Sequence, residues 1–163
     1  MKRPGKYEHG QSVIEFALVL PFLLLLIVNV VNFGAFLYSG IAVANAARTG
    51  ADQMMIGPAY LGYQTFPSVA AITNVVTDDI ASLPNHATAT VTVCSNNNGA
   101  VQSPYNCLAT VTDPQVATSV VGQVTVRYNY TALIPLWDFP GLGVHATLMP
   151  TTITRVATTR LIQ

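Results

Sequence analysis

Charged side chains are scarce in this chain. Of its 163 residues, 9% are charged and 51% are hydrophobic, whereas roughly a quarter of the residues in an ordinary soluble domain are charged. The seven lysines and arginines form no cluster outside the first six residues, so the phosphate-tracking surface of a nucleic-acid-binding protein is missing. The high apolar content argues against intrinsic disorder. The length suits one modest domain with an appendage.

Motifs for catalysis and metal binding are missing as well. The sequence contains no G-x-S-x-G, H-E-x-x-H or P-loop pattern and no C-x-x-C pair. We expect His86 and His145 to be structural or exposed. Asp78 and Asp79 are adjacent and so do not share one helix face, and we expect both to be solvated. The sequence therefore predicts a protein that is not an enzyme and that needs no cofactor or metal.

A long uncharged segment lies near the N-terminus. No charged residue occurs from Phe16 to Ala47, a run of 32 residues, and about 20 apolar residues are enough to span a bilayer. As a helix the run would reach about 48 Å, so we expect the helix to emerge from the membrane and continue. Because Lys2, Arg3 and Lys6 precede it, the N-terminus should stay in the cytoplasm, with residues from about 45 onward on the opposite side.

Three interpretations of this segment compete. A secretory signal peptide would use Ala42-Val43-Ala44 as its cleavage site, but the apolar stretch is too long for one. A plain membrane anchor is the second interpretation and stays open. The third depends on Glu15 at the edge of the apolar run, because a carboxylate there is costly unless it is interfacial or paired.

Cleavage after Gly10 would give Glu15 a partner. Gln11 would become the new N-terminus, and the first and fifth residues of a helix lie on the same face. The carboxylate of Glu15 could then neutralise the new α-amino group of its own chain or of a neighbouring chain. Type IV prepilins follow this logic, in which a short basic leader is removed before helices assemble.

Two segments carry a family resemblance. His9-Gly10-Gln11-Ser12-Val13-Ile14-Glu15-Phe16-Ala17-Leu18-Val19-Leu20-Pro21 resembles the N-terminus of TadE-like pseudopilins of the tight-adherence (Tad) pilus system. Asn45-Ala46-Ala47-Arg48-Thr49-Gly50-Ala51 resembles the Ala-Ala-Arg-x-Gly-Ala segment of the same family. Two positions depart from the pattern, since Asn32 stands where an acidic residue is frequent and Asp52 where a basic one is common. The resemblance covers residues 9–52.

This resemblance implies a minor pilin that acts in pilus assembly or initiation, and so in adherence. Its processing site would be Gly10 and Gln11, with Glu15 as the pairing carboxylate. Its partners would be a prepilin peptidase, other minor pilins, the inner-membrane assembly platform and the lipid bilayer, with no nucleic acid. It would cross the inner membrane once, with its C-terminal domain in the periplasm, or lie in the extracellular pilus after assembly. The alternative is an unprocessed, membrane-anchored periplasmic binding module.

The rest of the sequence predicts an α+β fold, with a long N-terminal transmembrane helix, a second helix and an antiparallel sheet of about four strands, as in pilins. The second helix is expected from Thr65 to Pro84, with its apolar residues at helical spacing. Period-two patterns predict strands near residues 87–93, 124–131, 144–148 and 152–159. The predicted organisation is a cytoplasmic leader over 1–10, a transmembrane and extended helix over 11–56, and an exported domain over 57–163.

Four smaller features complete the prediction. Pro21 should kink the first helix. Small residues form one stripe along that helix, and we expect this stripe to pack on the exported domain rather than between subunits: Gly40, Ala44, Ala47 and Ala51.

In an oxidising compartment, Cys94 and Cys107 are expected to form a disulfide. The apolar loop over 133–140 is expected to pack on the sheet, with an exposed contact patch as the alternative.

Overall fold

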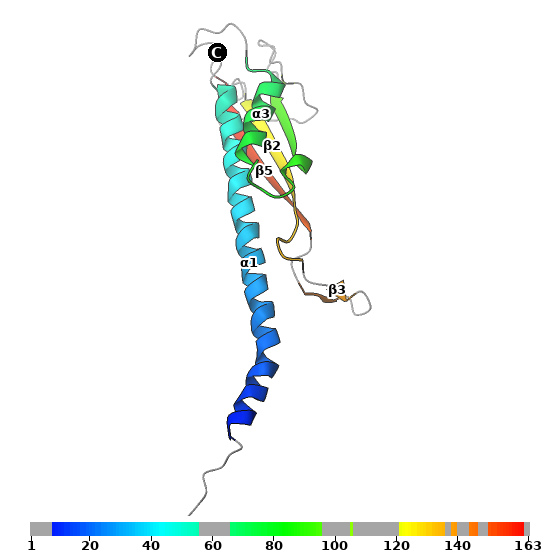
Figure 1. Cartoon of the computed structure of the whole chain (residues 1–163). Helices are drawn as coiled ribbons and strands as arrows, with labels where there is room; N and C mark the ends of the chain where they lie inside the picture. The colour runs from blue at the N-terminus through cyan, green and yellow to red at the C-terminus, as the bar shows by residue number, and fades with distance from the viewer. Residues whose placement is uncertain are drawn as a thin grey trace, which may run out of the picture. The chain divides into compact units, whose positions relative to one another are not determined.

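The computed structural model describes residues 8–55, 66–95, 105, 121–135, 138–139, 144–146 and 150–161. Its fold is α+β, as predicted (Figure 1). The helical elements are α1 (Glu8–Met55), α3 (Val69–Asp79) and the short 3-10 helix η1 (His86–Thr88). The strands are β1 (Thr90–Ser95), β2 (Val121–Tyr130), β3 (Asp138–Phe139), β4 (Val144–His145) and β5 (Thr151–Arg160).

The chain divides into two compact units. Residues 1–36 and 132–149 form the first unit, and residues 37–131 and 150–163 form the second. The N-terminal part of α1 therefore shares a unit with a segment that lies about a hundred residues further along the chain. The C-terminal part of α1 shares a unit with α3 and the larger sheet.

From Phe16 to Val28, α1 carries only apolar side chains. An 18-residue window of this helix has a mean hydropathy of 2.6, and none of it is buried within the protein. Large side chains such as Phe16, Phe22 and Leu26 are 58–70% exposed. A helix that is hydrophobic all round needs an apolar surrounding, so this part of α1 is suited by length and composition to cross a membrane. Pro21 lies inside the helix, and lipid-spanning helices tolerate such a residue; the kink stays a prediction.

The larger sheet has three antiparallel strands in the order β1-β2-β5. In its register Thr92 pairs with Thr125, which in turn pairs with Val156. The predicted alternation in β2 is confirmed, because Arg127 and Asn129 are exposed between buried neighbours. Four side chains on the other face of β2 are at most 1% exposed: Val124, Val126, Tyr128 and Tyr130.

The core of the second unit lies where α1, α3 and β2 meet. Gly50 marks the closest approach, since a Cβ atom there would lie 2.6 Å from Val76 Cγ2 and 3.2 Å from Val124 Cγ1. Four of the five residues whose spacing predicted the second helix are buried: Ile72, Val76, Ile80 and Leu83. The fifth, Val69, is 44% exposed at the start of α3.

Several predicted boundaries are corrected. The second helix does not begin at Thr65 but after Ser68, whose Oγ accepts a hydrogen bond from the Ala71 backbone N–H at 3.1 Å. It ends at Asp79, because the chain tightens into turns before Pro84 through bonds such as Leu83 N–H to Ile80 C=O.

The strand count also differs slightly from about four strands in one sheet. Residues 86–88 form η1 rather than the start of a strand, since Asn85 adopts a left-handed conformation with φ of 59°. The strand expected over 144–148 is described only as Val144–His145, and it pairs with β3 in a separate two-stranded hairpin.

Candidate processing and assembly site

Gly10, Gln11 and Glu15 lie in the first turns of α1. The side chains of Gln11 and Glu15 are exposed and share one face, with Gln11 Nε2 donating a hydrogen bond to Glu15 Oε1 at 3.1 Å. Residues 1–7 lie outside the described part of the chain. The two side chains thus meet one helical turn apart, and the predicted pairing of Glu15 with an α-amino group at Gln11 stays a prediction.

Gly10 has open space around it. A Cβ atom built at Gly10 would meet no heavy atom within 4 Å. Packing inside this chain therefore does not require glycine at this position. A requirement for glycine here, if measured, would have to come from another molecule that binds the exposed segment.

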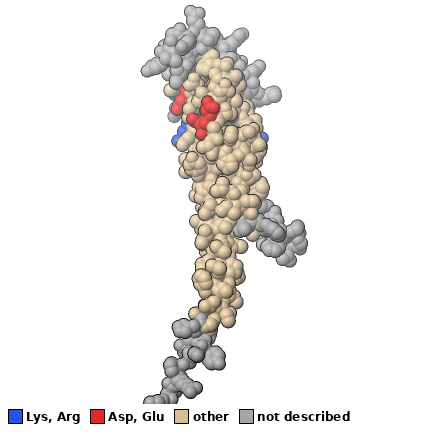
Figure 2. Space-filling model, in the orientation of Figure 1, with Lys and Arg blue, Asp and Glu red and all other residues tan. Residues whose placement is uncertain are grey.

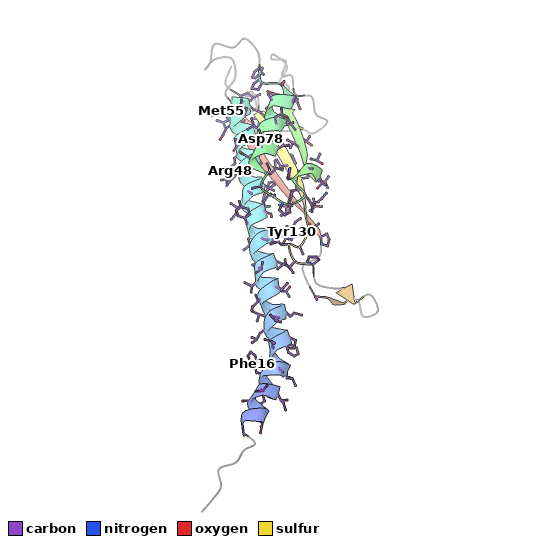
Figure 3. The ribbon with its side chains drawn as sticks, in the orientation of Figure 1. Phe16, Arg48, Met55, Asp78 and Tyr130 are labelled. Carbon is purple, nitrogen blue, oxygen red and sulfur yellow. The ribbon has the colours of Figure 1, made fainter. Side chains whose placement is uncertain are left out.

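An uncharged helical surface follows directly after Glu15. On the face drawn in Figure 2, the lower part of α1 carries no charged side chain. Phe16 begins this surface and projects from the helix (Figure 3). The carboxylate of Glu15 therefore sits at the boundary between the polar N-terminal end and the apolar run.

The small-residue stripe lies on the second unit's side of α1. Ala47 and Ala51 are 1% and 3% exposed, while Gly40 and Ala44 are half-buried. The nearest neighbour of a Cβ atom at Gly40 would be the Arg155 guanidinium, at 3.8 Å. In the isolated chain, much of this stripe is thus covered by the chain's own domain.

Sequence reasoning missed three polar side chains that face inward from α1. Asn32 is fully buried, and its carboxamide bonds to both the N–H and the C=O of Ile134. Asn29 donates to the Ala146 carbonyl at 3.0 Å. Ser39 is 2% exposed and hydrogen-bonds to Tyr128. Their spacing of three and seven residues within the uncharged run from Phe16 to Ala47 was the signal that could have revealed them.

Tyrosines hold the second unit's loops by their hydroxyl groups. Tyr128 Oη donates to the Pro84 carbonyl and Tyr105 Oη to the Pro67 carbonyl, the latter at 2.6 Å. Burial raises the pKa of Tyr105 to about 12. Burial also raises the pKa of Tyr128, against an opposing effect of its hydrogen bond from Ser39.

Cys94 lies near the end of β1 and is 4% exposed. Its neighbour Ser95 donates to the backbone carbonyl of Tyr105 at 2.9 Å, which ties the two segments together. The predicted partner Cys107 lies outside the described residues, so the disulfide stays a prediction.

The remaining polar candidates do not gather into a site. Asp78 and Asp79 are exposed on α3, where Figure 3 labels Asp78. His86 is exposed in η1, with Nδ1 3.0 Å from the Leu83 carbonyl, and the side chain of His145 is not described. Among the residues that the structure describes, no three His, Cys, Asp or Glu side chains are grouped to hold a metal ion.

These features define a class first: an α+β protein whose long, lipid-compatible N-terminal helix continues into a small domain, as in pilins. A family resemblance is limited to the sequence of that helix. Residues 10–52 match the family described as TadE-like protein, which confirms the resemblance over this part of the chain and agrees with a pilin-type protein of Tad systems. No curated protein and no solved structure matches the chain.

Proposed function

We propose that the protein is a minor pilin of a Tad-type pilus, without enzymatic activity, and that a prepilin peptidase cleaves it after Gly10. The observation that carries the proposal is the placement of Gln11 and Glu15, which lie in hydrogen-bond contact at the start of an apolar helix of TadE-like sequence. After cleavage, the α-amino group of Gln11 would lie within one helical turn of the Glu15 carboxylate.

The pairing of the α-amino group with the Glu15 carboxylate matters because both groups lie next to the membrane-spanning part of the helix. An unpaired carboxylate or ammonium group that is drawn below the interface of a bilayer is costly, and attraction between opposite charges strengthens as water is excluded. Pairing the amine with Glu15 of the same or a neighbouring chain would let the helix leave the membrane and enter a filament or its initiation complex. The exported second unit would then contact other minor pilins.

The N-terminus of the mature membrane protein tests this proposal. We expect mass spectrometry to find a chain that begins at Gln11, and only in cells that contain the prepilin peptidase. A chain that keeps residues 1–10 in both strains would contradict the proposal and would favour an unprocessed anchor for a periplasmic binding module.

A pair of glycine variants separates recognition of Gly10 by the peptidase from a general effect of leucine on the helix. Gly10→Leu should block cleavage, because a peptidase subsite that accepts glycine has no room for a leucine side chain. Gly34→Leu is the matched control on the same helix, since Gly34 likewise has no heavy atom within 4 Å of a built Cβ. The control should be cleaved like the wild type. Equal cleavage of both variants would contradict recognition at Gly10.

A further inference from the structure

Two asparagines interrupt the apolar surface of α1 near its middle. Asn32 is fully buried, with Nδ2 donating to the Ile134 carbonyl at 2.9 Å and Oδ1 accepting from the Ile134 N–H at 3.0 Å. Asn29 Nδ2 donates to the carbonyl of Ala146 at 3.0 Å and to that of Leu25 at 2.9 Å. Both asparagines thus bind the backbone of the same distant segment, of which residues 132–135, 138–139 and 144–146 are described and are called the arm.

The position of these asparagines along α1 determines the depth at which the arm would lie in the membrane. A span of about 20 residues that starts at Phe16 would end near Ala35. Asn29 and Asn32 therefore fall within the last two turns of the span, on the side away from Glu15. A carboxamide at this depth is costly unless it is hydrogen-bonded, and the arm's backbone supplies the partners.

The described part of the arm is itself suited to an apolar surrounding. Leu133 and Ile134 are 56% and 39% exposed, and Pro135 is exposed as well. The arm carries one Asp or Glu, Asp138, and no Lys or Arg. Backbone polar groups near lipid must be paired; Asn32 pairs both groups of Ile134, and β3 pairs with β4.

We propose that the arm is a second membrane contact, seated in the interfacial layer of the outer leaflet with Leu133 and Ile134 against lipid. Asn29 and Asn32 act as the clamp that fixes it to the membrane helix. We assign lipid as the occupant of the exposed arm surface, because these hydrogen bonds hold the arm against the helix that would cross the bilayer. The inference rests on the membrane-spanning role of α1 in the proposed function.

Single tryptophans in the full-length protein test the inference. Trp137 is the only tryptophan of the chain, so Trp137→Phe gives a protein without tryptophan fluorescence. Into it we would introduce Leu133→Trp, the matched control Val156→Trp, which replaces a β5 residue 54% exposed, and Phe22→Trp as the reference in the membrane helix. Each variant is reconstituted in phosphatidylcholine vesicles at high lipid-to-protein ratio. Fluorescence is then quenched by acrylamide from water or by brominated lipid from the bilayer.

We expect the Leu133→Trp protein to show blue-shifted emission, quenching by brominated lipid and little quenching by acrylamide. The Val156→Trp protein should show the reverse. Adding Asn32→Leu should return the Leu133→Trp emission toward that of water and leave the Val156→Trp spectrum unchanged. Asn45→Leu, the same change at an exposed position of α1, should have no effect on either reporter.

Three results would overturn the inference, and they differ in what they say of the proposed function. Strong acrylamide quenching at Leu133→Trp, with lipid quenching intact at Phe22→Trp, would remove the arm from the membrane and leave the membrane helix in place. Protection of Leu133→Trp from both quenchers would assign its surface to protein, such as a second copy. Loss of lipid quenching at Phe22→Trp would overturn the inference together with the membrane role of α1.

Discussion

At the scale of single residues, Gly50 sets how closely α1 approaches α3 and β2. A Cβ atom there would come within 2.6 Å of Val76 Cγ2, and valine is too stiff at χ1 to move aside easily. Overpacking costs about 1–3 kcal/mol, and the gain from replacing a helical glycine is about 1 kcal/mol. The difference between this cost and this gain leads us to expect that Gly50→Ala lowers the free energy of unfolding by up to about 2 kcal/mol.

Gly40 supplies the control for that prediction. It lies in the same helix and unit, but its nearest neighbour would be the flexible Arg155 guanidinium at 3.8 Å. Gly40→Ala should leave stability unchanged or raise it by up to about 1 kcal/mol. Urea unfolding of both variants in detergent, followed by circular dichroism, measures the difference. Equal stabilities would mean that packing at Gly50 is looser than described.

Tyr105 links stability to alkaline pH. Its pKa is about 12 in the folded protein, above the ordinary value of 10.0, because burial disfavours the charged phenolate. The unfolded chain therefore loses this proton first, so the stabilising contribution is complete below pH 10 and is lost as pH rises toward 12. Tyr128 shifts in the same direction and adds to the effect.

Replacing Tyr105 should weaken this pH dependence. Tyr105→Phe should show a shallower loss of stability between pH 10 and 12. It should also be about 1 kcal/mol less stable at neutral pH, because the Pro67 carbonyl loses its donor. Urea titrations at several pH values measure both effects, and an unchanged alkaline slope in the variant would contradict the assignment to Tyr105.

At the scale of elements, the start of α3 depends on one side chain. Ser68 has an extended backbone, with ψ of 154°, and its Oγ caps the N–H of Ala71. Ser68→Ala should destabilise the second unit by about 1 kcal/mol, as for other N-cap serines. Ser82→Ala, an exposed serine in the turn after the helix, is the matched control. A similar midpoint of urea unfolding for the two variants would argue against the cap.

The regular elements were the predictable part of the fold because their patterns are local. The apolar run predicted α1, and the alternation of β2 predicted which side chains are buried. The errors occurred where a local hydrogen bond or backbone conformation overrode the pattern. Ser68 set the helix start inside the predicted range, and the left-handed conformation of Asn85 turned the expected strand start into η1.

At the scale of the whole molecule, contacts far apart in sequence escaped prediction. Asn32 and Ile134 are separated by 102 residues, and no periodicity specifies such a pair. Residues 132–149 share a unit with the N-terminal part of α1, and the apolar pattern of the loop over 133–140 did not specify that association. A buried polar group requires a partner, so asparagines inside the apolar run could have indicated that some segment returns to the helix.

In the proposed function, assembly depends on the negative charge of Glu15. Glu15→Gln keeps the size of the side chain and an oxygen that can accept from Gln11, and it removes only the negative charge. We expect the variant to be cleaved after Gly10 and retained in the membrane, yet to be lost from the pilus fraction, because the new α-amino group has no counter-charge. Immunoblots of membrane and sheared pilus fractions measure both steps.

The matched control makes that experiment specific to position. Asp52→Asn removes another exposed carboxylate from α1 and changes the net charge by the same amount. Asp52 lies far along the helix from the proposed processing site. It should be cleaved and assembled like the wild type. If Glu15→Gln is cleaved and reaches the pilus fraction as efficiently as Asp52→Asn, then Glu15 does not pair with an N-terminal amine. The Gln11–Glu15 contact would then be an ordinary surface hydrogen bond at the edge of the membrane helix.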